Sequence, residues 1–87
     1  MPLNNFVQQY TVTATATALA NNPVYTSVFL TAKSTNTGIV YVGFSSAVSS
    51  SNGYPLEKGT SVVLKPGNTD AIYIVGTASD VVSAIGS

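Results

Sequence analysis

The chain of 87 residues contains no cysteine, no histidine and no tryptophan. Without cysteine it can form no disulfide framework, no thiolate nucleophile and no cysteine-ligated zinc site. Without histidine it lacks the commonest metal ligand and the side chain that most often exchanges protons near neutral pH. These absences exclude most familiar catalytic and metal-binding arrangements. We therefore expect no enzymatic activity, no metal ion and no cofactor.

Charge is also scarce, at 7% of the chain, and three lysines balance three carboxylates. With only Lys33, Lys58 and Lys65 as cations, no basic patch can neutralise phosphates, so nucleic acid is not an expected partner. Neither a membrane nor a small-molecule substrate is expected. Ordinary surfaces carry roughly 25–35% charged residues, and a net charge near zero favours association. The composition is therefore typical of a chain that is covered by copies of itself or by neighbours.

The three carboxylates are Glu57, Asp70 and Asp80. A glycosidase-type reaction needs two paired carboxyl groups, and a calcium site could use both aspartates with backbone carbonyls. These residues share no local motif, so both alternatives are disfavoured and the aspartates are interpreted as turn residues. The serine-rich segment 45–51 is interpreted as a solvated link, because no base is present to activate a serine.

The N-terminal quarter of the chain alternates between small apolar residues and threonine. Even positions from Phe6 to Ala20 fall on one face, and odd positions from Val7 to Leu19 on the other, as in a half-buried strand. No basic residue precedes Lys33, and the interrupting threonines disfavour a signal peptide. A straight strand of about 15 residues would span about 50 Å, so we expect it to bend or to cross between sheets. The alanines predict close packing over their face, and residues 1–9 are expected to extend as an arm.

The remaining chain predicts five shorter strands. They are expected at residues 24–33, 39–44, 60–65, 71–76 and 81–85, with 47–59 mostly loop. The polar segment 34–38 should fold residues 39–44 back as a hairpin partner of 24–33. Val28, Leu30 and Ala32 should share one face, Val62 and Leu64 should point inward, and Ile72 and Ile74 should lie opposite Tyr73 and Val75. Asn52-Gly53 tolerates positive φ, and Gly59 is expected to supply a second turn.

About six short strands without a helical period predict an all-β fold. The expected architecture is a small antiparallel β-sandwich or jelly-roll-like barrel. It comprises an N-terminal arm (1–9) and a single domain (10–87).

Aromatic residues supply the candidate interface. Tyr54 is interpreted either as an exposed anchor of the kind favoured in interfaces or as a cap on the end of the sandwich beside a buried Leu56. The five tyrosines could also form a sugar platform, although aromatics in strands more often belong to the core. The predicted interface residues are Leu3, Phe6, Tyr10, Tyr41, Phe44 and Tyr54.

Four segments carry a resemblance to a known class of proteins. They are Asn36-Thr37-Gly38, Val40-Tyr41-Val42-Gly43, Ser51-Asn52-Gly53-Tyr54-Pro55-Leu56 with Gly59 and Ser61, and Ala71-Ile72-Tyr73-Ile74. In this order the chain, from about Leu30 onward, resembles small all-β virion proteins of tailed bacteriophages. The threonine–alanine ladder before Asn21 is not part of the shared pattern.

The resemblance implies a structural role on a phage particle. The expected function is that of a capsid cement (decoration) protein, which bridges and stabilises neighbouring major capsid subunits. Its partners would be the major capsid protein and copies of itself, as a homotrimer at a three-fold site. It would lie on the outer capsid surface after synthesis in the host cytoplasm. The alternative is a tail- or fibre-associated module that binds a host surface or a carbohydrate.

Overall fold

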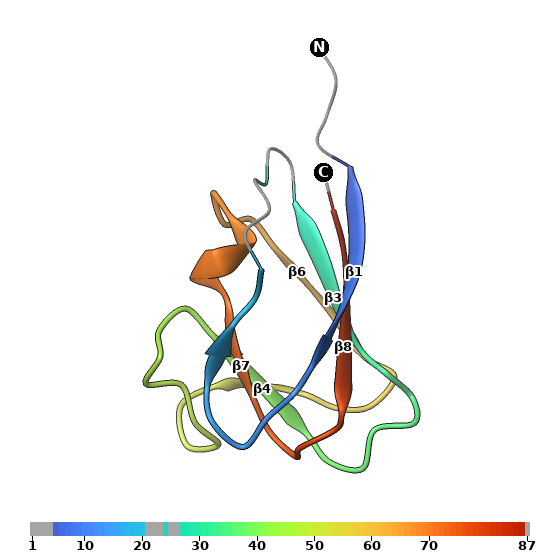
Figure 1. Ribbon diagram of the computed structural model, residues 1–87, viewed down its shortest axis with the longest axis vertical. Coiled ribbons are helices and arrows are strands. Elements are labelled where there is room, and N and C mark those ends of the chain that lie inside the picture. Colours follow the sequence, from blue (N-terminus) through green and yellow to red (C-terminus); the bar gives the residue numbers. More distant parts are fainter. Residues whose placement is uncertain (1–4, 21–23, 25–26, 87) are drawn as a thin grey trace.

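The computed structural model describes residues 5–20, 24 and 27–86. Within them the chain forms two four-stranded antiparallel sheets and one short 3-10 helix, η1 (Thr69–Ala71) (Figure 1). The strands are β1 (Phe6–Thr11), β2 (Thr17–Ala18), β3 (Val28–Ala32), β4 (Val40–Gly43), β5 (Tyr54–Leu56), β6 (Ser61–Leu64), β7 (Tyr73–Val75) and β8 (Val81–Gly86). None of the helical structure in this part of the chain is long and apolar enough to cross a bilayer. The predicted all-β, antiparallel fold is confirmed.

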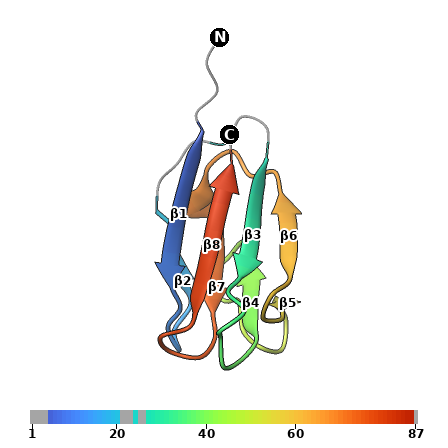
Figure 2. The same ribbon diagram turned by 90° about the vertical axis from the view of Figure 1, so that its right-hand side faces the viewer.

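The first four strands pair with the last four in reverse order. β1 pairs with β8, β2 with β7, β3 with β6 and β4 with β5. Two further pairings, β3 with β8 and β4 with β7, complete the sheets. Sheet A has the order β1-β8-β3-β6, and sheet B has the order β2-β7-β4-β5. Figure 2 shows sheet A in front, with β1 and β6 at its two edges.

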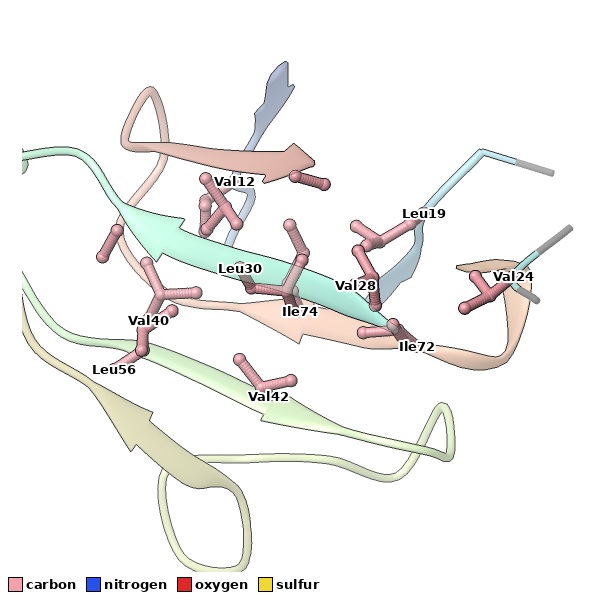
Figure 3. Close-up of a cluster of buried hydrophobic side chains, with 13 residues drawn as sticks. Val12, Leu19, Val24, Val28, Leu30, Val40, Val42, Leu56, Ile72 and Ile74 are labelled. Carbon is pink, nitrogen blue, oxygen red and sulfur yellow. The ribbon is translucent and has the colours of Figure 1, made fainter. Parts of the chain in front are cut away.

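The core lies between the two sheets, as in a β-sandwich (Figure 3). Leu30 on β3 and Val82 on β8 enter it from sheet A, and Val40 on β4 and Ile74 on β7 enter it from sheet B. The inward direction predicted for Val62 and Leu64 is confirmed. The faces predicted for residues 28–32 and 72–74 are confirmed as well, because alternate residues of a strand point to opposite faces, and the structure shows that Val28, Leu30, Ala32, Ile72 and Ile74 are buried.

The long N-terminal run crosses between the sheets, as predicted. β1 belongs to sheet A and β2 to sheet B. The buried residue of the run is even-numbered near β1, at Val12, and odd-numbered after β2, at Leu19. The hydroxyl group of Thr13 donates to the carbonyl oxygen of Thr15 at 2.7 Å where the chain bends. The predicted close packing over the alanines is not found among the described residues, since Ala14 and Ala18 are exposed.

Three details of the prediction differ from the structure. The hairpin of residues 24–33 with 39–44 was wrong, because β3 and β4 lie in opposite sheets. The loop predicted at 47–59 contains β5, an edge strand that tolerates Pro55 because one side of it needs no ladder bonds. Finally, the predicted boundary after residue 9 falls inside β1. Residues 6–9 pair with β8, whereas residues 1–4, including Leu3, lie outside the described residues.

Candidate interaction surfaces

The outer face of sheet A carries a row of apolar side chains that crosses all four strands. Val7 on β1 is opposite Ile85 on β8, Ile85 is opposite Phe29 on β3, and Phe29 is opposite Val63 on β6. Their exposed fractions are 72% for Val7, 59% for Ile85, 46% for Phe29 and 46% for Val63. We call these four residues the apolar row. Contiguous exposed apolar residues of this kind mark interaction sites more often than scattered ones do.

The neighbouring row on the same face is polar. It consists of Gln9, Ser83, Thr31 and Ser61, which are opposite one another in the same register. The hydroxyl oxygens of Thr31 and Ser61 form a hydrogen bond of 2.8 Å. A hollow of about 590 Å³ lies at the β1 side of the apolar row, where Val7, Phe29 and Ile85 line it together with Asn5, Phe6, Ser27 and Gly86. The apolar row is thus bordered by polar side chains on one side.

A second hollow lies beside two exposed aromatic residues. Phe44 is 61% exposed and Tyr54 is 56% exposed, and both line a hollow of about 440 Å³ with Val42, Gly43, Asn52, Val62 and Leu64. Leu56 is buried, as the capping alternative for Tyr54 required, but Tyr54 itself remains exposed. The anchor interpretation of Tyr54 stays a prediction.

The segment between β4 and β5 is a fixed loop. The backbone N–H of Ser49 donates to the side-chain oxygen of Asn52 at 2.8 Å, and the Asn52 amide donates to the Ala47 carbonyl at 3.2 Å. A Cβ added to Gly53 would lie 2.8 Å from both Tyr41 Cβ and Val48 Cγ2. Glycine is therefore required at position 53 because neighbouring atoms lie too close for a Cβ. The positive φ that the sequence allowed at Gly53 is not adopted. Gly59, where a second turn was predicted, has φ +78°.

The six predicted interface residues do not form one surface. Phe44 and Tyr54 share the hollow described above. Tyr41 is half-buried and lines a groove of about 720 Å³ that also includes Ala14, Ala16 and Ser49. Phe6 and Tyr10 are half-buried and pack against the core from β1. Leu3 lies outside the described residues.

The Asp80 side chain joins two segments that connect the sheets, the one between β3 and β4 and the one between β7 and β8. Its Oδ1 accepts hydrogen bonds from the backbone N–H of Thr37 at 2.9 Å and from the Thr37 hydroxyl at 3.2 Å, and its Oδ2 accepts one from the Gly38 N–H at 3.0 Å. The Thr37 backbone bond is the main cause of a lowered pKa for Asp80; burial opposes the shift, and the Gly38 bond adds to it. Asn36 exchanges two hydrogen bonds with the backbone of Val81. Across residues 5–20, 24 and 27–86, acidic residues form no cluster suited to a metal ion.

The apolar row was missed at the sequence level, although the sequence contains a signal for it. Val7, Phe29, Val63 and Ile85 each occupy the face opposite to the inward set of their strand. Large apolar residues at outward positions in several strands are the pattern that indicates such a surface. Their alignment depends on strand partners, which the sequence does not specify.

Comparison of the chain with protein-family models, with curated proteins and with solved structures finds no match.

Proposed function

We propose that the protein is a non-enzymatic structural protein of a tailed-phage particle. In this role it acts as a capsid cement protein that bridges and stabilises neighbouring major capsid subunits on the outer surface. The observation that supports the proposal best is the apolar row on sheet A, which is exposed and crosses the whole sheet. Burying such a row against a flat surface is favourable in proportion to the apolar area removed from water.

The size of the face fits binding to a repeated surface. Three strand spacings of about 4.8 Å and six residues of about 3.3 Å give a face of roughly 300 Å². Standard interfaces bury about 800 Å² per partner, so one copy would bind weakly through this face alone. Many linked copies on a regular particle would bind far more tightly than a single one.

We further infer that the two sheets form a jelly roll, an architecture used by virus capsid domains. This inference is supported by the reverse-order pairing of β1–β4 with β5–β8. A long antiparallel hairpin wrapped into two layers produces the same set of pairings. The architecture is compatible with the proposed role but does not by itself assign it.

Self-association and the N-terminal segment belong to the same proposal. The expected homotrimer would place three copies around a three-fold site, and residues 3–10 would contact a neighbouring protomer or capsid protein. Since residues 6–10 pair with β8, this part of the segment would act from within sheet A. Deleting residues 1–9 would remove most of β1, so point substitutions are the better test.

The proposal is tested by sedimentation of the purified protein with particles of the phage that carries its gene. Phe29→Asp should weaken particle binding at least tenfold, because loss of a central anchor typically costs about 2 kcal/mol or more. Phe44→Asp is the matched control, since Phe44 is also an exposed phenylalanine but lies outside the apolar row. Unchanged binding of Phe29→Asp would refute the proposed face.

The Phe44–Tyr54 hollow favours the second candidate function, a tail- or fibre-associated module that binds a host surface or a carbohydrate. Exposed aromatic faces beside an amide, here Asn52, are suited to a ligand with apolar faces and hydroxyl groups. Glycan-array binding that Tyr54→Ala abolishes would favour this function over cement.

A further inference from the structure

The four edge strands of the two sheets differ in how well they are protected. β2 has two residues, β5 contains Pro55, and β6 is followed directly by Lys65-Pro66. β1 has six residues, with neither proline nor charge, and an unbroken register with β8. Short length, proline, lysine and bulges are the devices that keep sheet edges from pairing with other chains. β1 has none of them, and its outer side has no strand partner among the described residues.

The hydrogen bonds identify which groups β1 presents at this edge. The N–H of Val12 donates to the Asp80 carbonyl at 2.7 Å, and the Val12 carbonyl accepts from the Ser79 N–H at 3.1 Å. In an antiparallel ladder, residues bonded to one neighbour alternate with residues directed away from it. Even-numbered residues of β1 therefore bond to β8. The residues whose backbone groups face the open edge are Asn5, Val7, Gln9 and Thr11.

We propose that β1 pairs with β1 of a second copy of this chain, antiparallel and about a two-fold axis at Gln8. In this register Val7 lies opposite Gln9 of the second copy, and Asn5 lies opposite Thr11. The backbone groups of all four edge-facing residues in each copy then form hydrogen bonds with the other copy. They form about eight backbone hydrogen bonds, within the range of about 10 ± 5 for a typical interface. The two copies of sheet A become one eight-stranded sheet.

The side chains of β1 suit a second copy as the partner. The order Phe6-Val7-Gln8-Gln9-Tyr10 is aromatic at both ends, so reversing the strand places Phe6 opposite Tyr10 and Gln8 opposite Gln8. These are non-hydrogen-bonded pairs, in which facing side chains approach most closely. Phe6 and Tyr10 are only half-buried in the single chain, so the pairing covers more of both rings. No charged residue precedes Lys33, so the two strands do not repel each other.

The two-fold axis runs perpendicular to the joined sheet, so the apolar rows of both copies lie on the same face of that sheet. If the proposed function holds, the pair would double the apolar area offered to a particle. The pairing itself does not depend on that function. It is two-fold, so native mass spectrometry distinguishes it from the expected homotrimer.

The register is tested by charge substitution at the axis. Gln8→Lys and Gln8→Glu each place like charges opposite one another, which destabilises the pair, so each variant alone should be monomeric where the unmodified chain is dimeric. An equimolar mixture should restore a dimer containing one of each. Native mass spectrometry measures the unmodified chain, each variant alone and the mixture. An unmodified chain that stays monomeric into the millimolar range, or a mixture that stays monomeric, overturns the proposal.

Disulfide trapping provides a second measurement, because the chain has no cysteine of its own. Gln8→Cys should form a disulfide-linked dimer on mild oxidation, since facing non-hydrogen-bonded residues lie within the Cα separation that a disulfide spans. Ser61→Cys on the β6 edge is the matched control and should remain monomeric. Equal cross-linking of the two variants contradicts the pairing. Circular dichroism establishes that both variants fold, and particle sedimentation tests the proposed function separately.

Discussion

At the scale of single residues, Asp80 closes one end of the sandwich. The link from β3 to β4 and the link from β7 to β8 both pass this point, and the Asp80 side chain joins them through Thr37 and Gly38. Its own backbone carbonyl also accepts the N–H of Val12, where the chain leaves β1. Through its carboxylate and its backbone carbonyl, Asp80 thus connects three segments that are distant in the sequence. This explains why an aspartate is buried in a chain with so few charges.

The lowered pKa of Asp80 predicts acid sensitivity. A depressed pKa in the folded state means that the carboxylate contributes stability above its unfolded pKa of about 3.9, and that this contribution is lost as pH falls through the folded value. The free energy of unfolding should therefore be constant near neutral pH and fall below about pH 4.

Asp80→Asn should lower the thermal midpoint at pH 7 and should reduce the acid-dependent fall, because the group that titrates is gone. Thermal unfolding followed by circular dichroism between pH 2 and pH 7 measures both effects. A variant as stable as the unmodified chain at pH 7 would contradict the role assigned to the carboxylate.

At the scale of elements, the loop between β4 and β5 depends on a small residue. Gly53→Ala should destabilise the fold by about 1–3 kcal/mol, as overpacking does, because the new Cβ would lie under 3.0 Å from Tyr41, Val48 and the Ser49 carbonyl. Gly67→Ala is the control: an added Cβ there meets nothing within 4 Å among the described residues. Urea unfolding of both variants gives the comparison. Equal free energies of unfolding for the two variants would contradict the requirement for glycine at position 53.

Sequence reasoning succeeded for properties that a strand carries by itself. Alternation placed Leu30 on one face of its strand and Ile72 and Ile74 together on one face of theirs, and these faces are the buried ones, because the side-chain direction in a strand is local. It failed for strand partners, since the link at residues 34–38 looks like a hairpin turn but is held across the sandwich by Asp80 and Val81. β-Pairing is set by contacts between distant segments, which one sequence does not display.

The candidate site was only partly predictable for the same reason. The exposed positions of Phe44 and Tyr54 agree with one interpretation of the loop sequence. The apolar row requires four strands in one register, so it becomes visible only in the folded chain. Phe6 was predicted for the arm and Tyr10 for the start of the domain, yet both lie in β1 and pack against the core.

At the scale of the whole molecule, two features suit assembly. The outer face of sheet A carries the apolar row across its width, and one edge of the same sheet lacks the usual protection. With a formal net charge of zero, copies experience little mutual repulsion. A protein that covers a repeated surface needs such features, and it needs no reaction centre.

The most direct test of the central claim is the copy number of the protein in purified particles, measured by quantitative mass spectrometry against the major capsid protein. A cement protein should be present in numbers comparable to that capsid protein and should be depleted in particles assembled with Phe29→Asp. A few copies per particle would point to a tail or fibre instead. Absence from purified particles would contradict the account altogether.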